Sequence, residues 1–117
     1  MALNIDKSFL NNLEDLIAKR DDNTLLALLS EEHPADIAEI FSELDLDDAT
    51  YVLKLLDSDL TSDALLEIEE DKREKILKNL SAQEIAEEIG EMDTDDAADI
   101  ISELSKERAS KVISEIQ

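Results

Sequence analysis

Residues 89–104 read IGEMDTDDAADIISEL, and this stretch contains every part of the pattern that we expect to decide the fold. Asp93 is a residue type that caps helix N-termini, and acidic side chains follow it in the first turns. Apolar residues then recur at helical spacing, so the stretch predicts a short amphipathic helix. The predicted buried stripe consists of Ala97, Ala98, Ile100, Ile101 and Leu104.

The same punctuation repeats along the chain at intervals of twelve residues. Ser81 and Glu84 predict a capping box at one of these starts. Asp93 and Asp96 predict a similar box with shorter acids. Each unit is too short to persist alone as a helix in water, so neighbouring units must stabilise one another. Helix starts are predicted after Asp45, Asp57, Glu69, Ser81, Asp93 and Ser105.

A longer register appears when residues 33–68 are laid on residues 81–116, a shift of 48. Twelve of the 36 positions then carry the same residue, more than this biased composition predicts. The first-half members of the identical pairs are Ile37, Ala38, Glu39, Glu43, Asp45, Asp47, Asp48, Ala49, Leu56, Ser62, Glu67 and Ile68.

Upstream of the repeat, apolar spacing predicts a first helix over residues 5–19 and a second over residues 24–29. Pro34 suits the first position of a third helix, because its missing N–H would have no helical partner there. The single glycine and single proline of the chain argue against β-hairpins and phosphate-binding loops.

We therefore expect an all-α fold of about nine short helices wound into a solenoid-like superhelix. Residues 1–21 are predicted to form an N-terminal helix and lead-in, and residues 22–117 the main unit. A chain of 117 residues suits a single compact domain with the first helix packed on it.

The composition excludes several classes of partner and site. Acidic residues outnumber basic ones by 32 to 11, and the net charge of −21 repels nucleic acids and anionic membrane surfaces. There is no cysteine, hence no disulfide, thiolate metal site or thiol nucleophile. The sequence also predicts no secretion signal and no membrane-spanning segment, since the first residues lack an apolar core and no apolar run approaches the ~20 residues needed.

Neither a calcium loop nor an enzyme is predicted. The run that starts at Asp57 has Ser62 and Ile68 where an EF-hand needs glycine and glutamate. His33, the only histidine, is interpreted as a helix-entry residue rather than as a zinc ligand or general base. With two Phe, one Tyr and no Trp, the chain also lacks the aromatic residues typical of a carbohydrate-cleaving site.

Two carboxylates of the opening stretch lie on one helical face. Asp95 and Asp99 are four residues apart, and no Lys or Arg lies between Asp93 and Leu104 to neutralise them. One interpretation is a solvated, solubilising surface. The other is weak binding of a hard divalent cation such as Mg²⁺, which prefers oxygen ligands and often takes only one or two carboxylates.

Two motifs carry a family resemblance. Residues 33–39, HPADIAE, and residues 92–99, MDTDDAAD, are separated by units of about twelve residues. In this order and spacing they resemble the cytosolic N-terminal domain of MgtE magnesium transporters, over roughly residues 22–117. The sequence departs from many relatives at Leu46, Ser58 and Thr94, where those relatives have proline.

The resemblance implies a right-handed superhelix that precedes a pair of CBS domains, a connecting helix and a transmembrane pore in a homodimer. It implies a place on the cytoplasmic side of the bacterial inner membrane. It also implies that weakly bound, regulatory Mg²⁺ ions between this domain and the CBS pair favour the closed pore. The metal ligands that it implies here are Asp63, which replaces a glutamate of relatives, and Asp95 and Asp99.

A second hypothesis uses the same fold without metal. The chain would then be a helical-repeat scaffold for protein interaction, comparable to the superhelical domains of flagellar motor switch proteins, with its acids serving solubility alone.

Overall fold

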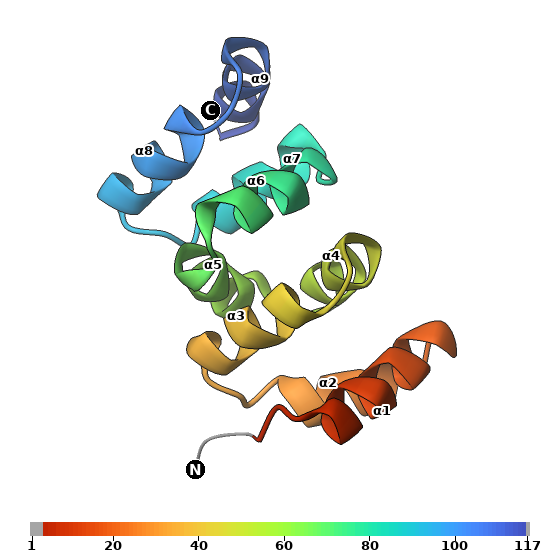
Figure 1. Cartoon of the computed structure of the whole chain (residues 1–117). Helices are drawn as coiled ribbons and strands as arrows, with labels where there is room; N and C mark the ends of the chain where they lie inside the picture. The colour runs from red at the N-terminus through yellow and green to blue at the C-terminus, as the bar shows by residue number, and fades with distance from the viewer. Residues whose placement is uncertain (1–3, 117) are drawn as a thin grey trace.

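The computed structural model describes residues 4–116, and all regular structure in this range is helical (Figure 1). Residues 1–3 and 117, which the predicted domain limits include, lie outside the described residues. Within residues 4–116 there are nine helices, which confirms the all-α class. They are α1 (Lys7–Ala18), α2 (Asp22–Leu29), α3 (Pro34–Glu43), α4 (Leu46–Leu55), α5 (Ser58–Glu67), α6 (Glu70–Lys78), α7 (Ala82–Ile89), α8 (Thr94–Ser102) and α9 (Lys106–Ile116).

The twelve-residue punctuation is confirmed, because each of the six predicted starts is followed directly by the first residue of a helix. The two N-terminal helices begin at different residues from those predicted. Asp6 caps α1, and its carboxylate accepts a hydrogen bond from the Phe9 N–H at 2.9 Å. Asp21 caps α2 in the same way, so that helix already begins at Asp22. His33 is the N-cap residue of α3 and Pro34 its first residue, as predicted.

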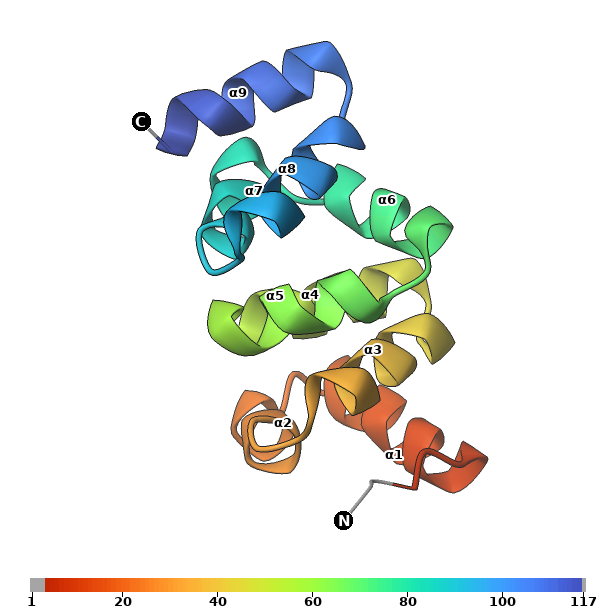
Figure 2. The same ribbon diagram turned by 90° about the vertical axis from the view of Figure 1, so that its left-hand side faces the viewer.

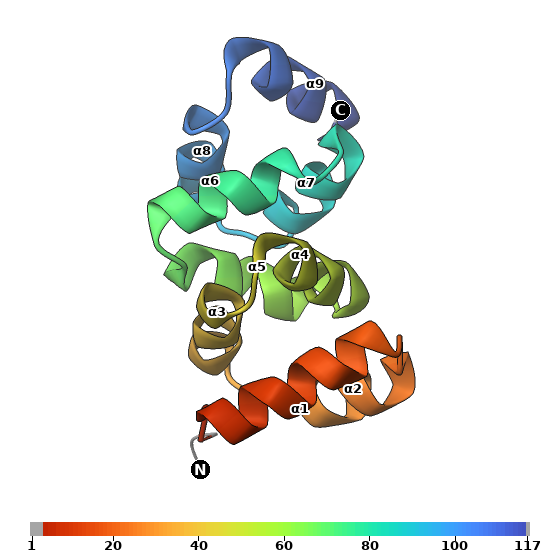
Figure 3. The same ribbon diagram turned by 45° about the vertical axis from the view of Figure 1, so that its right-hand side comes forward.

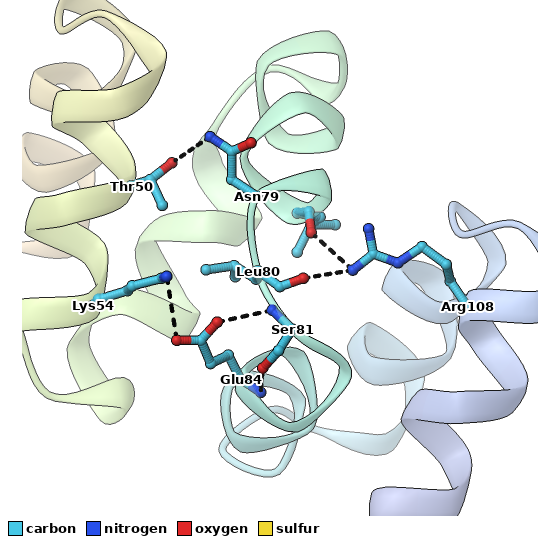
Figure 4. Close-up of polar contacts among 8 residues, drawn as sticks. Thr50, Lys54, Asn79, Leu80, Ser81, Glu84 and Arg108 are labelled. Atoms are coloured by element: carbon cyan, nitrogen blue, oxygen red, sulfur yellow. Dashed lines mark hydrogen bonds and ion pairs between the residues drawn. The ribbon is translucent and has the colours of Figure 1, made fainter.

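One of the two predicted capping boxes is present. The Glu84 carboxylate accepts from the Ser81 N–H at 2.8 Å, and the Ser81 hydroxyl accepts from the Glu84 N–H at 3.1 Å (Figure 4). The box predicted for Asp93 and Asp96 is wrong: Asp93 occupies the N-cap position of α8 without a side-chain cap bond. Aspartate lacks the methylene that lets Glu84 reach back to the preceding turn.

This contrast gives a matched stability prediction. Ser81→Ala is expected to lower the free energy of unfolding by about 1 kcal/mol, because it leaves a helix N–H without its partner. Asp93→Ala changes the corresponding residue of the next unit, whose side chain makes no cap bond, and is expected to cost less than half as much. Urea unfolding of both variants checks this. Equal losses at the two positions would contradict the role assigned to the box.

The helices are stacked so that those two apart in sequence pack together. α3 packs on α5, α5 on α7 and α7 on α9, while α4 packs on α1 and α6. Figures 1, 2 and 3 show the stack running from α1 and α2 at one end to α9 at the other, and its principal extents are 41 × 28 × 24 Å. Only two residues separate α3 from α4, α4 from α5 and α5 from α6.

The core runs along the length of this stack. It consists of aliphatic side chains with one aromatic ring, Phe41, and every described helix contributes at least one buried residue. The largest fully buried side chains include Leu13, Ile17, Leu25, Leu29, Ile37, Ile40, Phe41, Leu44, Leu65, Ile76, Leu77 and Ile85. No helix in the described part of the chain combines the length and the apolar character needed to cross a bilayer.

The predicted stripe on α8 is only partly buried. Ile100 is buried, whereas Ala97, Ile101 and Leu104 are half-buried. Ala98 is exposed, so its prediction as a buried residue is wrong. The reason lies in the position of α8 near the end of the stack: among the described residues, no later helix covers it as α6 covers α4.

Candidate metal-binding surface

Asp95 and Asp99 lie on successive turns of α8, and both side chains are exposed. The helix presents them because its apolar residues, with Ile100 at their centre, face the stack. Asp95 and Asp96 occupy the first turn, where the helix dipole favours negative charge. The sequence prediction that Asp95 and Asp99 share an exposed face is consistent with this arrangement.

The structure adds a cation that the local sequence did not reveal. Asp99 and Asp96 line a hollow of about 550 Å³ between α6 and α8, together with Arg73 and Glu103. The Arg73 guanidinium forms an ion pair with Glu103. The pKa of Arg73 is raised, chiefly by its hydrogen bond with Glu103, and the nearby charge of Asp99 adds to this. The field of Asp99 is therefore partly compensated by a residue from another helix.

Asp63 lies in a different hollow, of about 470 Å³, formed where α5 faces the segment between α2 and α3. Asp63 is exposed on α5, one turn after Asp59. Glu31 and Glu32 from the α2–α3 connection complete a group of acids in the lining, and no Lys or Arg takes part in it. The remaining lining residues are Ser30, Pro34, Asp57 and Leu60.

The three predicted metal ligands are therefore not brought into one site. Asp63 lines one hollow, Asp99 lines another, and Asp95 borders neither. Within residues 4–116, no group of three or more His, Cys, Asp or Glu side chains is arranged to hold a metal ion. Acids from two chain segments line each hollow, but no three of them are arranged as metal ligands, so a hydrated cation held there needs further oxygen donors from water or from another surface.

Three basic side chains, Arg73 among them, form bonds to helix ends. Arg73 Nη1 donates to the Ile68 carbonyl oxygen, at the end of α5, at 2.7 Å. Arg108 Nη2 donates to the Leu80 carbonyl oxygen, after α6, at 2.6 Å (Figure 4). Lys72 Nζ donates to the Leu44 carbonyl oxygen, at the end of α3, at 2.7 Å. These cations join helices of the stack, while the carboxylates remain on its surface.

One carboxyl group is buried, and the sequence patterns did not predict it. Glu88 on α7 is 6% exposed, and its Oε1 accepts a hydrogen bond from the Thr61 hydroxyl of α5 at 2.6 Å. Burial raises the pKa of Glu88 to about 7, although the bond from Thr61 opposes the shift. The signal was present in the 48-residue register, where Glu88 takes the position of the fully buried Ile40.

Two other groupings of charged residues are visible only in the tertiary structure. Glu31 and Glu32 join Asp63 only because the α2–α3 connection passes beside α5, and Arg73 reaches Glu103 from thirty residues earlier in the chain. His33, by contrast, is exposed at the start of α3 and forms no side-chain cap bond, consistent with its interpretation as a helix-entry residue.

The family comparison agrees with the motifs. The family model described as "MgtE intracellular N domain" matches residues 32–117. A search of curated proteins gives no match. The matched range contains both motifs and all three predicted ligands, and it begins later than the span of roughly residues 22–117 expected from the resemblance.

Proposed function

Because this chain belongs to the MgtE intracellular N domain family, we propose that it is the magnesium-sensing regulatory domain of an MgtE-type transporter. In this proposal the domain neither transports Mg²⁺ nor catalyses a reaction. The observation that carries it is the exposure of Asp63, Asp95 and Asp99, none of which forms an ion pair with Lys or Arg in the described chain.

The proposed mechanism rests on charge. A surface on a chain with a net charge of −21 repels an opposing acidic domain, and Mg²⁺ bound between the two sets of carboxylates removes that repulsion. The closed arrangement is then favoured because only it offers donors on both sides of the ion. An ion stabilises it by about 0.4 kcal/mol per independent site when its concentration equals Kd, so several ions must act together for a steep response.

The remaining parts of the proposal come from the family. The stack is proposed to be a right-handed superhelix, with residues 1–21 as its lead-in and residues 22–117 as the family unit. Its proposed partners are the CBS pair and transmembrane pore of the same full-length, homodimeric chain, on the cytoplasmic side of the bacterial inner membrane. Asp63 is proposed as a ligand with a side chain one methylene shorter than the glutamate of relatives.

The decisive experiment measures closure of the intact transporter as a function of Mg²⁺. Combined Asp63→Asn, Asp95→Asn and Asp99→Asn substitutions are expected to raise the Mg²⁺ concentration needed for closure by about tenfold, which corresponds to a loss of roughly 1.4 kcal/mol of closed-state stabilisation for each bound ion. The readout is ion flux across a magnesium series.

A charge-matched control removes three exposed acids outside both hollows: Glu39→Gln, Asp47→Asn and Asp71→Asn. Asp47 is the counterpart of Asp95 in the 48-residue register, so the control also tests position within the repeat. Control closure is expected to stay near that of the parent. If both triple variants need the same increase in Mg²⁺ concentration for closure, the effect is one of net charge alone. If the Asp63, Asp95 and Asp99 variant needs no more Mg²⁺ than the parent, these residues are not the ligands.

A second candidate function, a metal-independent interaction scaffold, is favoured by one observation: two large aliphatic side chains of α9, Ile113 and Ile116, are exposed. An amide-shift titration of this chain with Mg²⁺, alone and with its CBS partner, separates the candidates. Amide shifts centred on Asp63, Asp95 and Asp99 support magnesium sensing. If neither sample shows such shifts, the metal-independent scaffold is supported instead.

A further inference from the structure

The 48-residue register is also a register of packing. When the sequence is aligned with itself at a shift of 48 residues, α3 aligns with α7, α4 with α8 and α5 with α9. The close packing of α3 on α5 recurs as that of α7 on α9. The two halves differ in the next helix: α6 packs on α4, whereas no helix of residues 4–116 occupies the equivalent place on α8.

Two later helices cover the first half of the repeat, because α6 packs on α4 and α7 packs on α5. Asn79 Nδ2, just after α6, donates to the Thr50 hydroxyl of α4 at 3.3 Å (Figure 4). At the other end of α6, Lys72 and Arg73 donate to the carbonyl oxygens that end α3 and α5. This helix thus covers an apolar surface and satisfies two helix C-termini with Lys72 and Arg73, which follow the acidic Glu70 and Asp71 at its start.

The equivalent surface on α8 and α9 is open. Thr50 is 7% exposed under Asn79, whereas its counterpart Ala98 is exposed. Leu65 of α5 is buried completely, whereas its counterpart on α9, Ile113, is 40% exposed. Exposure rises from 3% at Ile68 to 53% at its counterpart Ile116, although both positions are isoleucine. Identical or similar side chains therefore differ in burial according to whether another helix is stacked on them.

We propose that this open end, formed by Ala98, Ile101, Leu104, Ile113 and Ile116, is a docking face for an amphipathic helix that carries a Lys-Arg pair near its start. The helix packs on α8 as α6 packs on α4, and reaches the end of α9 as Arg73 of α6 reaches the end of α5. Its Lys-Arg pair bonds the carbonyl oxygens that follow α7 and α9, and its apolar residues cover the open end. The inference concerns an interaction surface and does not depend on magnesium binding.

Charge favours this occupant over a second copy of the chain. α8 carries three acidic residues and no basic one, whereas α9 carries three basic and two acidic residues, so a cationic helix is favoured along the α8 side of the open end. Basic residues outnumber acidic ones in α6, the helix that fills the equivalent place. Two copies that each carry a net charge of −21 repel one another.

The chain itself supplies the probe. A copy of residues 70–80 appended directly after Gln117 keeps the 48-residue register, because Gln117 then stands where Glu69 stands before α6. The urea midpoint is expected to rise. The effect of a soluble paramagnetic probe on the Ile113 and Ile116 methyl groups is expected to fall toward the level measured at Leu65 and Ile68, which are 0% and 3% exposed and which α7 also covers.

The control extension has the same length and charge, but serine replaces the copies of Ile76, Leu77 and Leu80. It is expected to leave both the urea midpoint and the probe effect unchanged. A second control replaces the copies of Lys72 and Arg73 by glutamine and is expected to give an intermediate rise.

Two outcomes would overturn the proposal. One is a parental urea midpoint together with undiminished probe access in the chain that carries the unaltered extension. The other is sedimentation of the unextended chain as a dimer that Ile113→Asp disrupts, since the open end would then be the site of a second copy. A monomer whose open end becomes protected only by the unaltered extension supports it.

Discussion

An Arg73→Ala variant is expected to lose about 3 kcal/mol of its free energy of unfolding, because it breaks a largely buried ion pair and strands its partner. The side chains of Arg73 and Glu103 are 12% and 15% exposed, and the guanidinium bonds both carboxylate oxygens of Glu103. The same side chain donates to the Ile68 carbonyl oxygen. Alanine therefore leaves a carboxylate and a helix end without partners and disconnects α5, α6 and α8.

Urea unfolding at neutral pH measures this loss of unfolding free energy, and two further variants serve as comparisons. Lys19→Ala removes a cation from an exposed pair with Asp15, whose side chains are 68% and 56% exposed, and is expected to cost at most about 0.5 kcal/mol. Arg73→Lys keeps the charge but not the forked geometry, and is expected to recover less than half of the loss. Similar costs for Arg73→Ala and Lys19→Ala would show that the Arg73 network contributes little.

A Glu88→Gln variant is expected to be more stable than the parent above pH 7, by up to about 3 kcal/mol, and no more stable near pH 4.5. Burial raises the pKa of Glu88 from 4.5 to about 7 in the folded chain. Between these values the folded state binds the extra proton, so the contribution of Glu88 to stability falls as the pH rises through this window. Glutamine is never ionised, and its amide oxygen can still accept the bond from Thr61.

The measurement is a series of urea unfolding curves between pH 4.5 and 8. Glu87→Gln is the matched control, because it removes the same charge from an exposed neighbour on the same helix. Lys54 shares the hollow beside Glu88 but pairs with Glu84, at 3.4 Å, so it does not compensate the buried carboxylate. Parallel pH profiles for the two variants would refute the assignment of this pH dependence to Glu88.

The helix starts could be predicted because their signals are local. A residue such as Ser81 or Asp45 caps its own helix through a bond to the N–H three residues later. Burial is not local, and Ala98 shows the difference. Spacing placed Ala98 in the predicted buried stripe of α8, but it is exposed, because a position is buried only where another helix covers it.

For the candidate site, too, the sequence predicted the local arrangement but not the neighbours from other helices. Spacing placed Asp95 and Asp99 together on an exposed helical face, and family resemblance added Asp63; their role as ligands stays a prediction. The surroundings of these acids come from other helices. Arg73 reaches the Asp99 hollow from α6, and Glu31 reaches the Asp63 hollow from the α2–α3 connection, so neither neighbour is visible from sequence spacing.

The two-residue connections between α3, α4, α5 and α6 restrict how this chain can change in length over evolution. One inserted residue that extends a helix start turns the following helix by about 100°, which swings its apolar face away from the stack. Insertion or loss of a complete twelve-residue unit keeps every later face in phase. Natural relatives are therefore expected to vary in length by whole units or at the chain ends, and single-residue gaps should be rare between Leu44 and Glu69.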